Sequence, residues 1–101
     1  MIAERNLYAM APDGRGFELK IGVGSPYKLS EDEWACAVQL GGLHNNLSDQ
    51  HGIDSWQALQ LAYQLVAQLL AYFVQDGGQL LWEKDGEQVS LQDLIPKQPA
   101  F

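Results

Sequence analysis

Alternation of apolar and polar side chains at the start of the chain predicts a β-hairpin. Residues 2–11 and 17–23 are the two strand-like runs. Pro12-Asp13-Gly14 between them suits a type I turn that ends in a bulge, because glycine lacks the Cβ that penalises positive φ. This turn predicts a register with four cross-strand pairs on one face: Ala9–Phe17, Leu7–Leu19, Arg5–Ile21 and Ala3–Val23.

Arg5 is the one charged residue on this mostly apolar face. We expect Arg5 to lie at the end of the sheet, where its guanidinium reaches solvent or a carboxylate. The alternative is a β-bulge in the first strand that turns the side chain away from the core.

A third strand is predicted over residues 33–40, after a loop that ends in the acidic triplet Glu31-Asp32-Glu33. Gly41-Gly42 ends this strand, and the segment from Leu43 to Gly52 has no periodicity and predicts a loop. The residues of the strand expected to face the core are Trp34, Cys36, Val38 and Leu40.

The longest pattern runs from Ser55 to Gln75 and contains no charged side chain. Apolar residues at i, i+3 and i+4 spacing predict a helix, with its glutamines in a stripe roughly 80° wide. Asp54 is the predicted N-cap, with Gln57 reaching back as in a capping box, and Gly77 is the predicted left-handed C-cap. The core stripe is Leu59, Ala62, Tyr63, Val66, Leu69, Leu70 and Phe73, and the glutamines are Gln57, Gln60, Gln64, Gln68 and Gln75.

After the helix, residues 79–84 predict another strand, and residues 87–90 a short return strand. The tail is expected to dock through Leu94 and Ile95. This β-β-β-α-β order predicts one α+β domain over residues 1–101, in which an antiparallel sheet of four to five strands carries one long helix across one face.

One face of a sheet cannot cover a helix that is apolar around roughly 280° of its circumference. Leu61, Leu65 and Tyr72 lie beside the glutamine stripe and are left over. Either the C-terminal tail covers them or they form a contact with a partner, such as a homodimer contact.

A bilayer-spanning role for this helix is rejected, because three glutamine amides would lie near mid-bilayer. Its flanks carry Asp54 and Asp76 instead of basic residues. Glu4 and Arg5 interrupt the apolar core that an export signal would need, and the single Cys36 fits a reducing compartment. The expected location is therefore the cytoplasm, with no membrane partner.

Acidity is the main feature of the composition, with 13 acidic against 6 basic residues and a formal net charge of -7. A nucleic-acid partner is not expected, because affinity for phosphate backbones comes from Lys and Arg. The acidity either serves solubility or matches a cationic protein. In the second case the candidate contacts are Glu31, Asp32, Glu33 and Asp49.

Chemistry-bearing residues are few. Cys36 with His44 or His51 would be a nucleophile and base, but Cys36 falls on the apolar alternation of its strand, which favours a buried thiol. His44, Asp49 and His51 have a spacing that matches no standard metal-ligand pattern. We therefore expect no catalytic residue, no metal and no cofactor.

Five segments resemble a family of small bacterial proteins catalogued as a domain of unknown function. They are IAER (2–5), IGVGSP (21–26), WAC (34–36), GL (42–43) and, above all, HGIDSWQALQLA (51–62). The resemblance covers most of the chain. It implies a stand-alone bacterial cytosolic domain of the size and acidity common among immunity proteins of toxin systems, and it implies no activity.

Two hypotheses about function follow. The first is a non-catalytic protein-binding module, such as an immunity-type inhibitor of a cationic toxin. The second is a small enzyme or ligand-binding domain that uses the loop around His44, His51 and Asp54, near the positive end of the helix.

Overall fold

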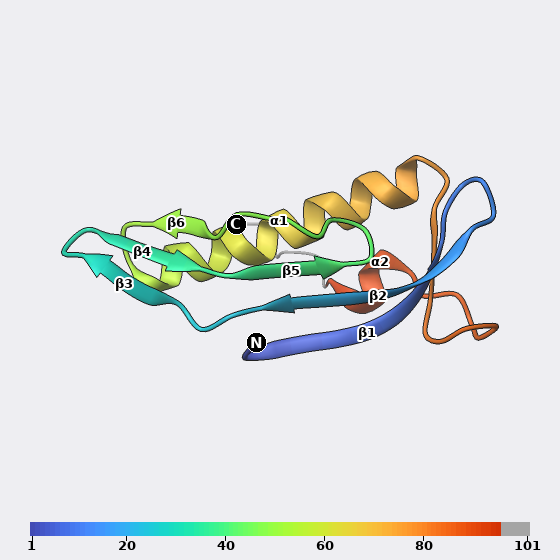
Figure 1. The fold of residues 1–101 in the computed structure, drawn as a ribbon, viewed down its shortest axis with the longest axis horizontal. Coiled ribbons are helices and arrows are strands. Elements are labelled where there is room, and N and C mark those ends of the chain that lie inside the picture. Colours follow the sequence, from blue (N-terminus) through green and yellow to red (C-terminus); the bar gives the residue numbers. More distant parts are fainter. Residues whose placement is uncertain (96–101) are drawn as a thin grey trace.

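Seven strands and two helices make up residues 1–95, which are the part of the chain that the computed structural model describes (Figure 1). In chain order they are β1 (Ala3–Met10), β2 (Gly16–Val23), β3 (Tyr27–Ser30), β4 (Glu33–Cys36), β5 (Val38–Gly41), β6 (Gln50–Gly52), α1 (Ser55–Gln75), β7 (Gln79–Leu81) and α2 (Leu91–Leu94).

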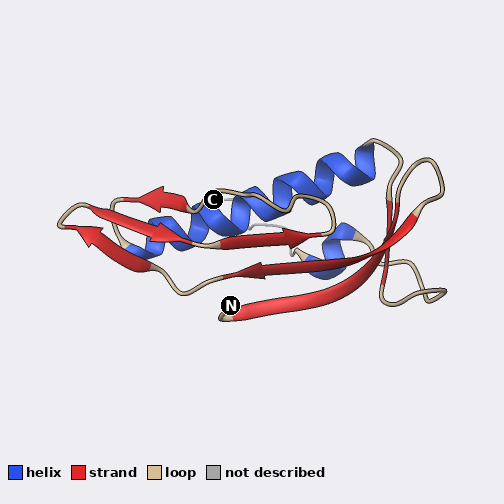
Figure 2. Ribbon diagram, in the orientation of Figure 1, coloured by secondary structure: helices blue, strands red, loops and turns tan. Residues whose placement is uncertain are grey.

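The strands form two antiparallel sheets. One has the order β5-β2-β1-β7 and the other the order β3-β4-β6. The two sheets follow each other along the length of the molecule, and α1 lies across one face of both (Figures 1 and 2). The predicted α+β class and the single long helix on one face are confirmed, whereas one sheet was expected and two are present.

The β1–β2 hairpin has the predicted register, with all four predicted pairs in place. Its turn is closed by the Gly14 N–H, which donates to the Ala11 carbonyl over 2.9 Å, and Gly14 has a φ of 90°. The ladder has no bulge at Arg5, which pairs with Ile21 and is exposed. Of the two alternatives for Arg5, the side chain therefore reaches solvent without a bulge, and it makes no ion pair with any carboxylate of residues 1–95.

The predicted third strand is in fact two strands in different sheets. β5 pairs with β2 and β4 pairs with β3, so the chain forms a second, longer hairpin with a break at Ala37. Val23 opposes Val38 but Tyr27 opposes Ala35, so the pairing shifts by one residue at the break. Pro26 lies within this break and has no N–H to give to a ladder, which explains why pairing is interrupted there.

Two strands were not predicted, and one is shorter than predicted. All four residues of β3 are exposed, so that strand carries no alternation to detect. β6 has only three residues, in the segment predicted to be a loop. β7 ends at Leu81, and the predicted return strand is reduced to a single bridge between Leu81 and Gln88.

The core lies between α1 and the sheets. The buried side chains of α1 are Ala58, Ala62, Val66, Leu70 and Phe73. Opposite them lie buried residues of five strands and of the loop before α2, among them Leu7, Leu19, Cys36, Leu40, Leu80 and Val89.

Tyr63, expected in the core stripe of the helix, is instead 37% exposed at its edge. Tyr63 lines a groove between the helix and the β1–β2 hairpin. All five glutamines of the predicted stripe are exposed, as expected from their position on the helix.

The ends of α1 follow the predicted caps. Asp54 Oδ1 accepts the Gln57 N–H over 2.8 Å, and Gln57 Oε1 accepts the Ile53 N–H over 2.8 Å. Asp76 is the C-cap residue itself, and Gly77, the next residue, has a φ of 102°, in the left-handed region that favours glycine.

Leu94 and Ile95, the last residue and the C-cap of α2, pack against the core, so the predicted docking is confirmed. The remainder of the predicted tail, residues 96–101, lies outside the described residues. Within residues 1–95 neither helix has the length and apolar character needed to cross a membrane.

Candidate functional site

The outer face of α1 carries no charge along its whole length. The five exposed glutamines run along its middle. Aromatic side chains border them on both sides: Trp56 is 70% exposed, Tyr72 50% and Tyr63 37%. This outer face of α1, from Trp56 to Gln75, is therefore an uncharged surface of amides and aromatic rings on a protein of net charge -7.

Helical geometry explains how the two borders form. At about 100° per residue, Trp56 and Tyr63 are seven positions apart and fall on one side of the glutamine stripe. Leu61, Leu65 and Tyr72 fall together on the other side. The Gln68 amide donates to Tyr72 Oη over 2.6 Å, which ties the stripe to that border.

The three predicted contact residues of the helix differ in exposure. Leu65 is half-buried and packs against the core, and Leu61 is also half-buried. Tyr72 is the most exposed of the three, at 50%. Trp56 was not among the predicted contact residues, because it lies outside the apolar set at i, i+3 and i+4 spacing. Its position one residue before Gln57 places it beside the glutamine stripe.

The acidic triplet forms the turn between β3 and β4, at one end of the molecule (Figure 1). Glu31 lies 3.7 Å from Lys28 Nζ, and Glu33 Oε2 lies 3.1 Å from His51 Nδ1. Asp32 makes no ion pair with any residue that the structure describes. Lys28 therefore neutralises part of the charge of the triplet.

Asp49 is separate from the triplet in its contacts. Its carboxylate accepts a hydrogen bond from the Tyr27 hydroxyl, and this bond raises the pKa of Tyr27 above its ordinary value. Tyr27 lies opposite Ala35, and Asp49 precedes the strand on the far side of β4. The Tyr27 side chain therefore crosses β4 above Ala35, which is fully buried. The hydrogen bond between Tyr27 and Asp49 thus links the two sides of this sheet.

The structure does not bring together the residues of the alternative ligand loop. His44 bridges to Leu40 and His51 pairs with Ala35, five residues apart along the β4–β5 segment, or about 16 Å at strand spacing. The Asp54 carboxylate is engaged as the N-cap. Within residues 1–95, no three His, Cys, Asp or Glu side chains are grouped so as to hold a metal ion.

Cys36 is fully buried. Its thiol donates to the Gly24 carbonyl over 3.2 Å, and burial raises its pKa. A buried, protonated thiol is a poor nucleophile, because the thiolate is the reactive form. The geometry at Cys36 is that of a packed core residue.

Comparison with models of protein families identifies the family of the chain. A family profile described as "Domain of unknown function (DUF6968)" matches residues 3–92. The chain belongs to this family. No curated protein and no solved structure matches it.

The DUF6968 match runs from the first residue of β1 into α2. It therefore includes both sheets, the acidic turn and the entire outer face of α1. The resemblance noted in the sequence, to a domain of unknown function, is confirmed at the level of the family. The outer face of α1 is thus part of the DUF6968 domain itself and not of an added segment.

Proposed function

We propose that this DUF6968 protein is a non-catalytic protein-binding module and that the outer face of α1 is its interface. The observation that carries the proposal is the combination of three exposed aromatic rings with a complete absence of charge on a strongly acidic protein. Interface centres are depleted in charged residues and enriched in Tyr and Trp. Trp and Tyr are also frequent among the few residues that supply most of the binding free energy.

The partner that fits the remaining surface is a cationic protein. A net charge of -7 attracts such a partner over distances up to about a Debye length, which is roughly 8 Å at physiological ionic strength. In its specific form the proposal is an immunity-type inhibitor that acts in the bacterial cytosol and covers the surface of a cationic toxin. The small size, the acidity and the family resemblance support this form of the proposal.

Site-specific crosslinking tests the interface. A photoreactive phenylalanine analogue replaces Tyr72 in one variant and Gln64 in a second, and each is irradiated in cells of the native host. The control places the same analogue at Lys20, an exposed position on β2 that pairs with Asn6. We expect one and the same protein to be captured from Tyr72 and Gln64 and not from Lys20.

The captured protein is then bound to purified variants. Trp56→Ala and Tyr72→Ala should each weaken the complex by at least about tenfold, as expected of interface hot spots. Capture of a second copy of this chain would assign the face to a homodimer. Capture from Lys20 alone, or undiminished binding by both alanine variants, would refute the interface.

The salt dependence of association tests the role of the acidic turn. Glu31→Gln with Asp32→Asn should slow association with the captured partner and flatten its dependence on ionic strength, because exposed charges act mainly on the encounter. Asp49 is left intact because it holds Tyr27. The matched control removes two exposed charges elsewhere, Glu18→Gln with Glu87→Gln. Equal slowing by both double variants, measured by surface plasmon resonance at low and high salt, would show that only the net charge matters.

A further inference from the structure

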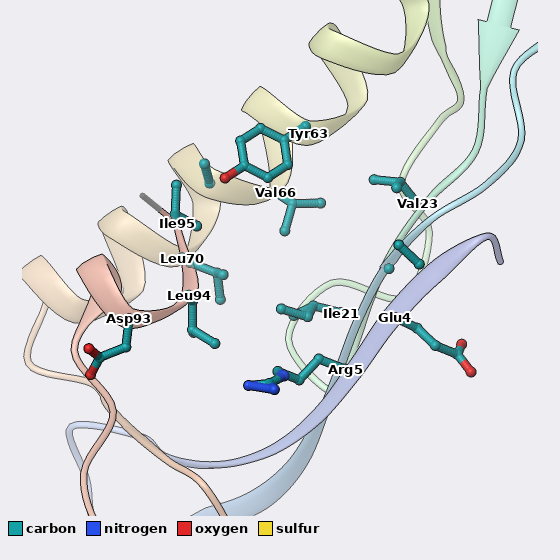
Figure 3. Close-up of a pocket in the computed structure, with 13 residues that line it drawn as sticks. Glu4, Arg5, Ile21, Val23, Tyr63, Val66, Leu70, Asp93, Leu94 and Ile95 are labelled. Atoms are coloured by element: carbon teal, nitrogen blue, oxygen red, sulfur yellow. The ribbon is translucent and has the colours of Figure 1, made fainter. Parts of the chain in front are cut away.

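A groove of about 380 Å³ opens between α1, α2 and the open end of the β1–β2 hairpin, where β1 begins and β2 ends (Figure 3). Its volume lies near the lower end of the range of small-molecule sites, about 300–1,000 Å³. Its walls are mainly apolar, and the larger apolar side chains are Ile21, Val23, Val66, Leu70, Leu94 and Ile95.

The groove exists because the inner face of β1 changes character along its length. Toward the turn, Leu7 and Ala9 are buried in the hydrophobic core. Toward the amino terminus, the same face carries Ala3 and Arg5, which are both exposed. A short side chain and a cation at these positions leave the space between sheet and helix unfilled, and Leu94 and Ile95 close it on one side.

Arg5 supplies the positive charge of the groove. Figure 3 shows its side chain extending from β1 along the open end, near Leu94. Its Cζ lies over the Trp82 ring, 4.9 Å from the ring centroid, which is within the range of a cation–π contact. Within residues 1–95 no carboxylate pairs with it.

The two carboxylates beside the groove are engaged elsewhere. Glu4 points away from the cavity in Figure 3 and lies 3.7 Å from Lys20 Nζ. Asp93 accepts the Ser90 N–H over 3.2 Å in the capping box of α2. The groove therefore combines an apolar channel with a single cation whose hydrogen-bonding capacity is not used by these neighbours.

We propose that this groove binds an aliphatic carboxylate of medium chain length. The carboxylate accepts hydrogen bonds from the Arg5 guanidinium, whose forked donors match the two oxygens. The hydrocarbon chain lies against Ile21, Val66 and Leu94 and is removed from water there. Tyr63 lines this groove and also borders the outer face of α1, so the two proposed sites adjoin at that residue, but binding of the carboxylate does not require the protein partner.

A monoanion fits better than a phosphate ester. The lining offers one arginine and no lysine, so a dianion would keep about one uncompensated charge beside apolar walls. A nucleotide would also need stacking and polar partners for its base and sugar, and the walls of the groove are largely aliphatic. A single hydrocarbon chain of medium length matches both the volume and the lining.

Isothermal titration calorimetry of the full chain with sodium decanoate, kept below its micelle concentration, tests the proposal. Decan-1-ol is the neutral probe of the same chain length. We expect decanoate to bind at least about tenfold more tightly than decanol, because a hydrogen bond to a charged group adds to burial of the chain. Methyl resonances of Ile21, Val66 and Leu94 should shift during the titration.

Two matched variants test whether the Arg5 guanidinium is the cation that binds the carboxylate. Arg5→Met keeps an apolar stem and should weaken decanoate binding about tenfold or more, with decanol unaffected. Arg15→Met makes the same change at the hairpin turn, outside the groove lining, and should leave both affinities unchanged. Ala67→Leu adds bulk to the wall of the groove and should abolish binding of both probes. Circular dichroism melts establish that each variant is folded.

Four results would overturn the proposal. They are no heat of binding up to millimolar decanoate, equal affinity for decanol, equal losses in Arg5→Met and Arg15→Met, and binding that appears only after deletion of residues 96–101. The last result would assign the groove to the protein's own tail.

Discussion

At the scale of single residues, Cys36 gives a direct test of core packing. Its side chain is fully buried and its pKa is raised, mainly by desolvation. Iodoacetamide at pH 8 should therefore modify the native protein at least about a hundredfold more slowly than the urea-unfolded chain, because reaction requires opening of the structure. Mass spectrometry of quenched samples measures both rates. Rapid labelling of the native protein would show that the thiol is accessible.

The raised pKa also has a consequence for stability. The native state favours the neutral thiol, so the contribution of Cys36 is fully present below the unfolded pKa of about 8.5 and is lost as pH rises through the higher folded value. Urea unfolding from pH 7 to 10 should show a steeper decline for the parent than for Cys36→Ala. Equal slopes would show that burial does not perturb this group.

Gly52 is required by a close backbone approach. A Cβ at this position would lie 2.6 Å from the Ala58 nitrogen in the first turn of α1, and backbone cannot yield as a flexible side chain can. Gly52→Ala should reduce the free energy of unfolding by at least about 2 kcal/mol. Gly41→Ala is the control, because its Cβ would meet nothing closer than 3.8 Å, and it should change stability by less than about 0.5 kcal/mol. Similar urea midpoints for the two variants would contradict the packing of β6 on the helix.

At the scale of elements, the face assignment of α1 is tested by placing one charge on each side. Ala62 is fully buried, whereas Gln64 is exposed. Ala62→Asp should cost more than about 4 kcal/mol, because a carboxylate would enter the core without a partner, and Gln64→Glu should be tolerated. Val66 is also buried on this face, but it lines the same groove as Arg5, so Ala62 is the better position for this test. Thermal melts that agree for the two variants would reverse the assignment.

The elements with strong local signals were predicted from the sequence. α1 and the β1–β2 hairpin combine periodic apolar positions with cap and turn residues such as Asp54, Gly14 and Gly77, so local and tertiary preferences agree. β3 and β6 lack such signals, because they are short and held by pairing to β4. The break at Ala37 was missed because both halves of that segment keep the same alternation while they pair with different partners.

The two candidate sites, the outer face of α1 and the groove, also differ in how far the sequence predicts them. The outer face of α1 could be predicted because one helix carries all of its residues. The groove could not, because β1, β2, α1 and α2 each contribute to its walls. The sequence showed that Arg5 is out of place on its strand, but which elements surround it depends on the arrangement of the whole chain.

At the scale of the molecule, two sheets in one chain raise the question of whether they unfold together. α1 spans about 31 Å at 1.5 Å per residue and contacts strands of both sheets, along a molecule 47 Å long. The β2–β3 and β4–β5 segments also run from one sheet into the other. Loss of either sheet would uncover half of the helix, so we expect one cooperative unfolding transition.

The three tryptophans allow this to be measured. Trp34 and Trp56 report on the β3-β4-β6 sheet and the start of α1, whereas Trp82 follows β7 in the other sheet. In Trp82→Phe, and separately in the double variant Trp34→Phe with Trp56→Phe, urea unfolding is followed by fluorescence and by circular dichroism at once. Each variant can have its own midpoint, but within each the two signals should coincide, because helix and sheet unfold as one unit. A fluorescence transition that precedes loss of helix in one variant alone would show that the corresponding sheet unfolds independently.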